Sequence, residues 1–552
     1  MSTHSSMVDN SVSYLEYQGK YKGLKGWIFS TDHKRIGLLY LVSMLFFFTI
    51  GVTFGFLMRL ELLTPGKTII DPQTYNSFFT LHGIIMIFLF IIPGLPAVFG
   101  NFFLPIMIGA KDVSFPRLNL FSWWLFLIGG ILAIVSVILP GGAVDTGWTF
   151  YVPYSVRTGT NVWPALLAAF VLGFSSILTG LNFVTTVHRL RAPGMTWFRM
   201  PLFIWSLYST AWIQILATPI IGITLLMVLF ERVFGFGVFD PTLGGDPVLY
   251  QHLFWIYSHP AVYIMILPAM GVISEIIPVF SRRTIFGYKF IAFSSIAIAF
   301  FGSLVWAHHM FTAGMSSPAM FIFSLLTFIV AIPSAIKVFN WVSTLYKGSI
   351  QTDPPLLYAL AFIFLFAIGG FTGLIQGALS VNMHIHDTSF IVAHFHYVMF
   401  GGTGFGIFAA LHYWFPKMFG RKYNLKTAKA GFWTLFVGFN VLYFPMFIMG
   451  WLGMPRRYYD YLPEFHIYHS ISTYGSWILI TGLIIMFTNL YVAYKRGEVT
   501  TEENTWGGET LEWQTMTPPP LENFEEIPEV TGDPYGYKQN DEPETIKAQE
   551  AH

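Results

Sequence analysis

The sequence predicts an all-α integral membrane protein with twelve transmembrane helices and both termini on the cytoplasmic (inner) side. Hydrophobic residues make up 54% of the 552 residues and charged residues 11%, with a mean hydropathy of +0.59, a composition typical of membrane proteins. Apolar stretches of about 20 residues, long enough to span a bilayer, recur along the chain. Lys and Arg gather in alternate loops, as the positive-inside rule expects if the N-terminus is inside.

The twelve predicted spans are separated by polar loops. They cover residues 36–62, 78–107, 117–140, 163–187, 202–230, 250–278, 288–313, 317–346, 356–379, 389–416, 429–453 and 470–494. Only a few basic residues fall in the outer loops, namely Lys67, Arg157, Arg232, Arg456 and Arg457.

The domain division follows from these spans. Residues 1–35 form an inner N-terminal segment, residues 36–496 the twelve-helix core, and residues 497–552 an acidic, Pro-rich tail. The tail has too little apolar surface to fold alone, so we expect it to lie on partner subunits or to be mobile.

Charge and cysteine usage exclude several functions. The net charge of +1 gives no indication of nucleic-acid binding. The chain has no Cys, which excludes a disulfide, an iron–sulfur cluster, a thiolate copper site and a covalently attached haem. Any redox metal must therefore rest on His or oxygen ligands.

Two histidines in the tenth span are the central feature of the sequence. Residues two apart on a helix point about 200° away from each other, so His394 and His396 face opposite sides. One helix would then form the wall between two metal centres. The alternative is a pair of polar histidines satisfied by neighbouring helices.

The predicted topology places six histidines from four spans in the outer third of the membrane: His82, His259, His308, His309, His394 and His396. Independent structural histidines would be scattered in depth, and imidazole inside a bilayer is usually functional. Imidazole suits haem iron and copper. His82 and one of the tenth-span pair could ligate a six-coordinate haem, and the other could hold an open haem. His259, His308 and His309 would make a facing copper site for a small diatomic ligand.

Tyr263 follows His259 by four residues and therefore shares its helix face. A phenol there could supply a proton and an electron beside the metals. The alternative is a tyrosine that serves only in helix packing.

Nine short motifs occur in one order along residues 27–458. They are WIFSTDHK (27–34), GAKD (109–112), FPR (115–117), YQHLFW (250–255), HPAVY (259–263), WAHHMFT (306–312), HDT (386–388), HFHYV (394–398) and GMPRRY (453–458). Together they resemble subunit I of the haem–copper oxidases, the catalytic subunit of cytochrome c oxidase.

The resemblance implies a role for each histidine. His82 and His396 would ligate the low-spin haem, and His394 the high-spin haem. The copper ligands would be His259, His308 and His309. Tyr263 would be joined covalently to His259.

The resemblance also implies the contacts around the haems and two further ion sites. Arg456, Arg457 and Trp148 would meet haem propionates, since planar guanidinium forks suit carboxylates. Arg59 would meet the formyl group of the low-spin haem. His386 and Asp387 resemble ligands of a magnesium or manganese ion shared with a partner, and Glu61 resembles part of a calcium or sodium site.

The implied cofactors are two haems of the a and a3 types, one copper (copper B) and the ions named above. If cytochrome c is the donor, a subunit II must carry the two-copper centre that receives its electrons, because this chain lacks Cys. Subunits III and IV, membrane lipid and dioxygen complete the expected partners. We expect a bacterial cell inner membrane in preference to the mitochondrial inner membrane.

Two proton routes are predicted from the inner side. Lys337, with Ser334 and Ser274, would lead to Tyr263, because a lysine in lipid is costly and should face a polar interior. The alternative is that Lys337 snorkels to the inner surface. The second route resembles that of the family and would begin at Asp112. The alternative is that Asp112 is a simple solvated acid in a loop. Further along it lie Asn101, Asn119, Ser175 and Ser176.

One position departs from the family pattern. Many members carry a glutamate two residues after the first copper ligand, where this chain has Ala261. Tyr257 lies one turn before Ala261 on the same helix face and is followed by Ser258. This pair resembles a subgroup of the family that lacks the glutamate. Our hypothesis is that Tyr257 and Ser258 end the second route and that proton pumping persists.

The predicted function is a terminal respiratory oxidase that reduces dioxygen to water and pumps protons. A quinol oxidase of the same family is the alternative, and a nitric oxide reductase fits Tyr263 and the proton routes less well. A non-redox secondary transporter is disfavoured because the histidines cluster in the outer third and not at the midplane. A membrane zinc hydrolase is disfavoured because no His-Glu-x-x-His motif is present.

Overall fold

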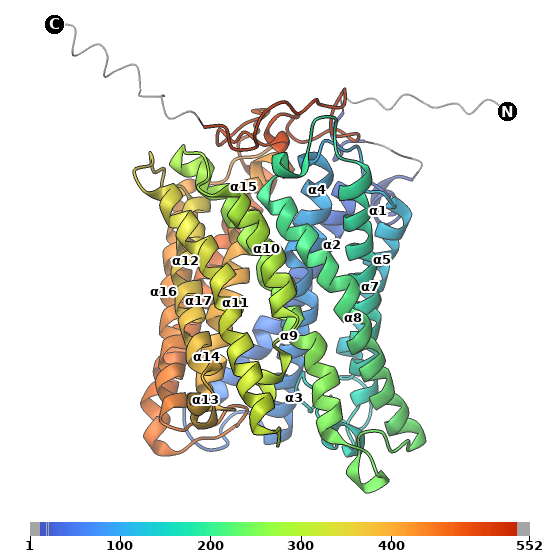
Figure 1. Cartoon of the computed structure of the whole chain (residues 1–552), viewed down its shortest axis with the longest axis vertical. Coiled ribbons are helices and arrows are strands. Elements are labelled where there is room, and N and C mark those ends of the chain that lie inside the picture. The colour runs from blue at the N-terminus through green and yellow to red at the C-terminus, as the bar shows by residue number, and fades with distance from the viewer. Residues whose placement is uncertain (1–11, 18, 20, 538–552) are drawn as a thin grey trace, which may run out of the picture.

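The computed structural model describes residues 12–17, 19 and 21–537. Within these residues the chain is a bundle of long helices that run side by side, and it forms no β-strand (Figure 1). Eleven of the described helices are long and apolar enough to cross a membrane. The all-helical membrane fold predicted from the sequence is therefore confirmed.

The membrane-length helices follow the chain in order. They are α2 (His33–Glu61), α3 (Pro72–Ile84) continuing to α4 (Asn101–Met107), α5 (Pro116–Val135), α7 (Val162–Arg189), α8 (Leu202–Phe234), α9 (Pro247–Ser281), α11 (Ser317–Leu345), α12 (Pro354–Gly377), α14 (Ser389–Val398) continuing to α15 (Phe405–Phe419), α16 (Leu425–Trp451) and α17 (His466–Arg496). Short helices α1 (Gly23–Ile28), α6 (Tyr154–Arg157) and α13 (Leu379–Ile385) lie outside them.

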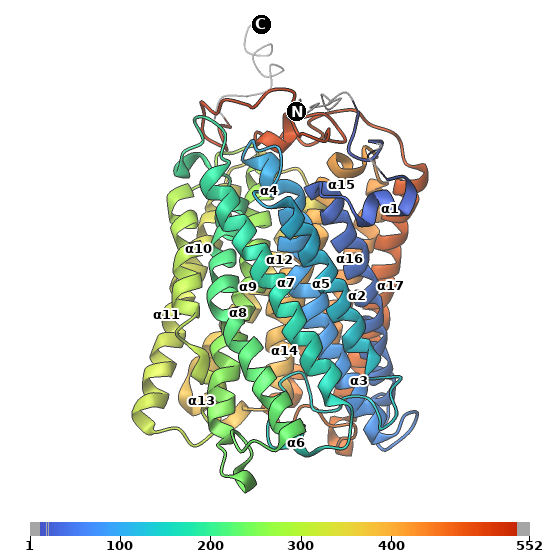
Figure 2. The ribbon, with the colours of Figure 1, turned by 90° about the vertical axis from the view of Figure 1, so that its right-hand side faces the viewer.

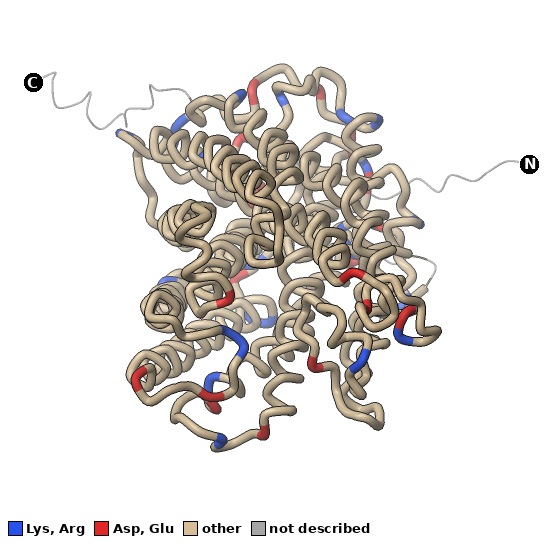
Figure 3. The backbone as a smooth tube through the Cα atoms, turned by 60° about the horizontal axis from the view of Figure 1, so that its bottom comes forward, with Lys and Arg blue, Asp and Glu red and all other residues tan. Residues whose placement is uncertain are grey.

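Several helix N-termini carry sequence signals that predict a helix start. Pro72 and Pro247 occupy first helical positions, where the missing N–H costs nothing. The preceding Asp71 and Asp246 accept hydrogen bonds from free backbone N–H groups of the first turn. Charged residues likewise gather on the loops and helix ends (Figure 3).

The seventh predicted span, 288–313, is two elements. Helix α10 (Tyr288–Gly302) ends early, and a separate 3₁₀ turn, η5 (Trp306–Met310), carries His308 and His309. The expectation that both histidines lie in the helix was therefore wrong. The ring of Tyr263 lies so close to Gly302 that a Cβ there would come within 2.4 Å of it, so the helix ends against this tyrosine.

The two ends of the described chain meet on one side of the bundle (Figures 1 and 2). The backbone N–H of Tyr14 donates to the carbonyl of Pro519 over 3.0 Å. An even number of crossings is needed to bring them there, and α10 added to the eleven long helices gives twelve. Because α10 has only 15 residues, the count of twelve stays a prediction, as does the assignment of this side to the cytoplasm.

The described part of the tail, residues 497–537, packs across the bundle at that end. Trp513 and Tyr535 are 2% and 3% exposed, and the tail's Asn523 is fully buried. The Asn523 side chain accepts from Lys34 Nζ over 2.8 Å and donates to the carbonyls of Ala110 and Lys111. The expectation that the tail is mobile was therefore wrong for these residues, and its contact with partner subunits stays a prediction. A few buried aromatic and amide side chains suffice to hold the tail on the bundle, because the helix ends supply the apolar surface and hydrogen-bond partners that the tail lacks. Residues 538–552 lie outside the described part.

Wide helical turns interrupt two of the spans that carry histidines. The backbone forms π turns at Ile85–Ile91 and Gly94–Gly100 after His82, and at Met399–Gly404 after His394 and His396. Such turns often occur at functional sites. Gly94 lies where a Cβ would come within 2.5 Å of the Ile407 side chain, so the two interrupted spans approach each other closely.

Candidate metal centre

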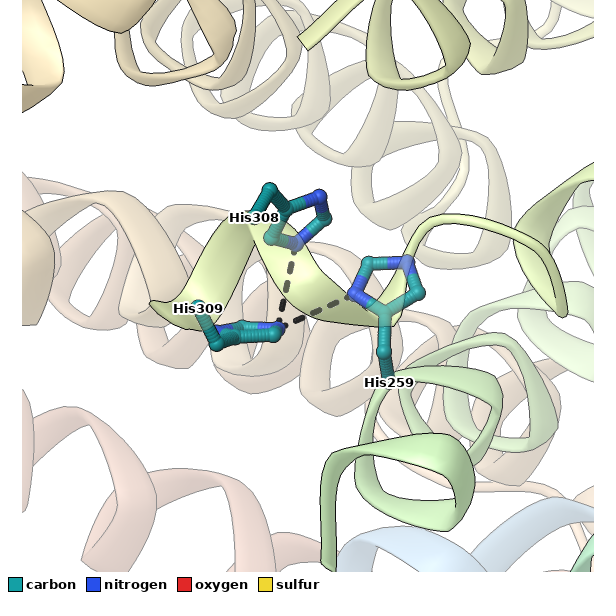
Figure 4. Close-up of side chains that lie close together, drawn as sticks. All are labelled: His259, His308 and His309. Atoms are coloured by element: carbon teal, nitrogen blue, oxygen red, sulfur yellow. Dashed lines mark hydrogen bonds between the residues drawn. The ribbon is translucent and has the colours of Figure 1, made fainter. Parts of the chain in front are cut away.

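Three histidines from two elements converge on one point. His259 comes from α9, and His308 and His309 come from the 3₁₀ turn η5 (Figure 4). His309 Nε2 lies 3.1 Å from both His259 Nδ1 and His308 Nε2, and the three ligand atoms all fall within 4.8 Å of one another. Nitrogen atoms this close, with no carboxylate or thiolate among them, can hold one metal ion of the kind that imidazole prefers.

Neighbouring side chains fix two of these rings. The hydroxyl of Thr327 donates to the carbonyl of Phe323, so its oxygen can accept from Nδ1–H of His308 at 2.9 Å. This contact leaves Nε2 of His308 deprotonated and directed at the other rings. Trp255 stacks on His309 with ring centroids 3.7 Å apart and planes 9° apart.

A cavity of about 1110 Å³ adjoins this cluster, and all six predicted histidines line it. Pockets for a single small ligand measure roughly 300–1,000 Å³, so this cavity has room for a very large ligand or for two. Its walls come mainly from α2, α3, α9, α11, α12, α14, α16 and α17.

The other three histidines are each held through Nδ1. His82 uses the carbonyl of Gly51 at 2.7 Å, His396 that of Val392 at 2.8 Å, and His394 the hydroxyl of Thr372 at 3.1 Å. Nε2 of each ring, which lines the cavity, has no hydrogen bond among the described residues. An imidazole with Nδ1 protonated and Nε2 free is the form that ligates haem iron.

The helix faces agree with this use. His394 contacts α12, and His396 stacks on Tyr443 of α16 with ring centroids 4.1 Å apart. The two rings therefore project from opposite sides of α14. Gly55 and Gly373 lie under the rings of His82 and His394, where an added Cβ would come within 3.0 and 3.1 Å of them. These residues fit two haems, one against each side of α14.

Tyr263 lies one turn after His259, as the spacing predicts. Its ring centroid is 4.9 Å from that of His259, and both residues line the cavity. Nε2 of His259 is buried without a hydrogen-bond partner. His259 thus differs from the other rings, because its Nδ1 turns to the cluster and leaves Nε2 free.

The rim of the cavity carries the predicted charged residues. Arg456 pairs with Asp387 over 2.9 Å, and His386 lies 3.8 Å from the same carboxylate. Arg457 also lines the cavity, as does Trp148, whose Cβ would lie 3.2 Å from a Cβ added at Gly83, next to His82. Arg59 Nη2 donates to the carbonyl of His469 and to Thr473, while its Nε is buried and unpaired.

Glu61 has a structural role in this chain. Its carboxylate accepts from the backbone N–H groups of Thr68, Ile69 and Ile70, over 2.7 to 2.9 Å. These bonds hold the loop after α2. The calcium or sodium site at Glu61 stays a prediction.

Lys337 is buried and points into the bundle. It is 1% exposed, and its Nζ donates to Ser295 Oγ over 2.7 Å and to the carbonyl of Ile291 over 3.0 Å. The snorkelling alternative is therefore wrong for this residue. Ser274 accepts from Trp341 Nε1, and Ser334 lines the cavity.

The second predicted route begins outside the helices. Burial and the nearby charge of Asp32 raise the pKa of the Asp112 carboxyl from 3.8 to about 8, so it is not the simple solvated acid of the alternative. Farther along, three side chains have buried polar atoms without a hydrogen-bond partner among the described residues, namely Asn101, Asn119 and Ser176. Ser175 instead bonds the carbonyl of Ser122.

Tyr257 and Ser258 lie on α9 and are 3% and 1% exposed. Neither lines the large cavity. Ser258 Oγ is buried without a partner. The structure therefore places this pair beside the cavity and not on its wall.

Three residues of the site were missed by sequence reasoning. Thr327 and Ser295 are ordinary helix residues without a motif. His469 lines the cavity and shares a helix face with Ser476 and Leu483, at spacings of seven. That spacing, on a helix that begins with two histidines, His466 and His469, was the one available signal.

Buried imidazoles around one cavity in a helical membrane bundle are the ligand set that a class of proteins, the haem- and copper-binding redox proteins of membranes, would need. Comparisons with known proteins agree with it. A family profile described as "Cytochrome C and Quinol oxidase polypeptide I" matches residues 35–484. Cytochrome c oxidase subunit 1 of Thermostichus vulcanus is 42% identical over 96% of both chains, that of Synechocystis sp. 45% over 92% of both, and that of Cereibacter sphaeroides 40% over 91% and 95%.

A solved structure agrees on the fold. A haem–copper terminal oxidase studied as a dimer by cryo-electron microscopy has a TM-score of 0.72 at 21% identity, and the match covers 84% of this chain and 85% of that chain. The chain therefore belongs to the family of cytochrome c and quinol oxidase subunit I.

The Thr327 contact gives a first prediction. Thr327→Val removes the acceptor for Nδ1–H of His308, and we expect about 10–100-fold weaker copper binding by the three-histidine cluster. Thr327→Ser keeps the hydroxyl and should bind like the wild type. Copper retained per protein after dialysis against a graded chelator measures the difference. Equal retention by the Val and Ser variants would contradict the role of Thr327.

The raised pKa of Asp112 gives a second prediction. Between pH 4 and pH 8 the folded state keeps the Asp112 proton while the unfolded state loses it, so wild-type stability falls over this window. Asp112→Asn has no such proton. We expect its thermal midpoint, relative to wild type, to rise as the pH increases from 5 to 8. The exposed Asp533→Asn serves as control. If the difference in thermal midpoint between Asp112→Asn and wild type did not change with pH, the pKa of the Asp112 carboxyl would not be raised.

Proposed function

We propose that this chain, the catalytic subunit of a terminal oxidase by family and fold, takes electrons from cytochrome c and reduces dioxygen to water while pumping protons. The electrons would arrive through a two-copper centre on a subunit II, since this chain has no Cys. The observation that carries the proposal is the single cavity that all six histidines line.

The assignment of the rings rests on the family resemblance and agrees with their faces. His82 and His396 would hold the low-spin haem, and His394 the high-spin haem on the other side of α14. His259, His308 and His309 would hold the copper. When bound, these groups supply electron transfer and a place for dioxygen. The protein's part is to orient the rings, to exclude water with apolar walls and to bring protons.

The remaining groups have defined tasks in this proposal. Tyr263, on the wall beside His259, holds a proton and an electron for the reaction, and the free Nε2 of His259 is where the two side chains would be joined. Arg456, Arg457 and Trp148 would contact propionates at the rim. His386 and Asp387, which face the same rim, would bind magnesium or manganese.

Protons would move from the inner side along two sets of polar groups. Lys337 is held by Ser295 beside the Ser274–Trp341 pair, and Ser334 continues to the cavity. Asp112, protonated at neutral pH by its raised pKa, is suited to deliver a proton towards Asn101, Asn119 and Ser176. We further propose a bacterial inner membrane as the location. Subunits III and IV would be additional partners.

The decisive experiment is a reduced-minus-oxidised spectrum of the purified complex with and without carbon monoxide. We expect two haem signals, of which one responds to carbon monoxide because its iron has an open position. His396→Ala should remove the unresponsive signal and His394→Ala the responsive one. His412→Phe is a matched control, since His412 is also buried and held through Nδ1 by the carbonyl four residues earlier but does not line the cavity. Colourless wild-type protein would refute the oxidase function.

The copper content of the same purified complex distinguishes cytochrome c from quinol as the electron donor. More than one copper per complex supports a subunit II with a two-copper centre and cytochrome c as donor. A single copper supports a quinol oxidase of the same family.

Tyr257 gives the prediction for proton pumping. Tyr257→Phe removes the hydroxyl that would replace the missing glutamate at position 261, and we expect fewer protons ejected per electron with oxygen reduction retained. Proton ejection by reconstituted vesicles measures this ratio. Ala261→Glu in the Tyr257→Phe background should restore pumping if the two positions serve one route. Unchanged pumping by Tyr257→Phe would remove this hydroxyl as an obligatory relay.

A further inference from the structure

Two carboxyl side chains are enclosed where the tail packs on the end of the bundle. Glu275 lies in the last two turns of α9 and is 1% exposed, and Glu512 lies in the tail and is fully buried. Neither carboxyl forms an ion pair with any of the described residues. A buried carboxylate without a partner is costly, so such a group tends to keep its proton.

The hydrogen bonds of the two carboxyls differ. Oε1 of Glu275 accepts from the backbone N–H of Phe203 over 2.8 Å and from the hydroxyl of Tyr535 over 2.6 Å. Both carboxyl oxygens of Glu512 are buried without a hydrogen-bond partner among the described residues. Donors favour the charged form of a carboxyl. Glu275 is therefore the better place for a negative charge, and Glu512 the better place for a proton.

Only one cation among the described residues acts on Glu512, the Lys417 ammonium of α15. Its Nζ donates to the carbonyl of Thr515 over 2.7 Å and to the hydroxyl of Thr517 over 2.8 Å, both in the tail. One ammonium offsets one carboxylate, so the second acid of the pair stays neutral only by holding a proton. The other titratable groups facing the two acids are phenols, neutral near pH 7, namely Tyr288, Tyr413, Tyr535 and Tyr537, while Glu503 faces Lys417 and Arg282 faces Tyr537.

We propose that Glu275 and Glu512 form a proton-binding site between α9 and the tail, in which one proton on Glu512 holds the tail on the bundle. Loss of that proton to solvent leaves two buried carboxylates against one ammonium. Because Glu512 belongs to the tail, release of the tail separates the two charges and returns the Glu512 carboxylate to water. The site therefore makes docking of the tail sensitive to pH.

The direction of this dependence follows from Glu512. Burial raises the pKa of its carboxyl from 4.5 to about 7, against the opposing effects of Thr510, Trp414 and Lys417. Between pH 4.5 and pH 7 the docked tail keeps the proton while a released tail loses it. Docking is therefore strongest below this window and weakens by about tenfold per pH unit across it. Above the window the contribution of Glu512 no longer changes.

The site bears on the loop of Asp112 through another residue of the tail. The side chain of Asn523 donates to the carbonyls of Ala110 and Lys111, directly before Asp112. A released tail withdraws this contact, so pH on this side of the bundle would regulate the loop where the second proton route is proposed to begin. This consequence rests on the proposed function, whereas the docking of the tail does not.

The test measures docking directly. This chain has no Cys, so Gln514→Cys at an exposed position of the tail provides one site on it for a spin label. In the purified complex, electron paramagnetic resonance line shapes during urea titration give the ratio of released to docked tail from pH 5 to pH 8. We expect Glu512→Gln to lose about a tenfold change per pH unit from the wild-type dependence between pH 5 and pH 7, because Gln cannot release a proton.

Two further variants make the test specific. Glu526→Gln, which removes an exposed carboxyl of the same tail, is the matched control and should follow the wild type. Glu275→Gln leaves Lys417 to neutralise an ionised Glu512, so the pH dependence should move to lower pH. A wild-type slope in Glu512→Gln, or an unmoved curve in Glu275→Gln, would overturn the proposal. Should Glu512→Gln not assemble, Glu275→Gln decides. The label reports docking whether or not the complex reduces dioxygen, so failure of the proposed function is seen separately.

Discussion

The structure depends on how four of the six histidines are held through Nδ1 so that Nε2 is free. His82 and His396 rest on backbone carbonyls, and His308 and His394 on threonine hydroxyls. Both threonine hydroxyls donate their hydrogen to backbone carbonyls of their own helices. Each hydroxyl oxygen can therefore act toward the histidine ring only as an acceptor. The protonation of Nδ1 is thus decided by the scaffold, and Nε2 is left for the cavity.

His259 differs from these four, and the difference has a consequence. It turns Nδ1 toward His309 and leaves Nε2 buried beside Tyr263 on the same helix. The reversal is possible because α9 places position 263 one turn after position 259. Nδ1 of His259 is thereby placed at the three-histidine cluster, and Nε2 is left without a protein partner on a ring that contacts Tyr263.

The sequence predicted the parts of this arrangement that depend on helical periodicity and on membrane cost. The opposite faces of His394 and His396, the proximity of Tyr263 to His259 and the buried side of Lys337 all follow from helix geometry and from the price of polar groups in lipid. The sequence could not show where helices break. Helix α10 ends at Gly302, where the Tyr263 ring packs so closely that a Cβ would clash with it, and His308 and His309 follow on a separate 3₁₀ turn. That close packing joins residues far apart in the chain.

The tail is a second case in which the local sequence did not predict a contact made by the rest of the chain. Its composition is that of a segment unable to fold alone, and that inference about an isolated chain is sound. The tail nevertheless lies on the bundle, because the helix ends offer Lys34 and the carbonyls of Ala110 and Lys111 as partners for Asn523. Composition describes what a segment can bury within itself. The surface supplied by the rest of the chain decides whether it is ordered, and here that surface includes the loop between α4 and α5, which carries Asp112. The tail and this loop, more than four hundred residues apart in the sequence, thus lie together where the second proton route is proposed to begin.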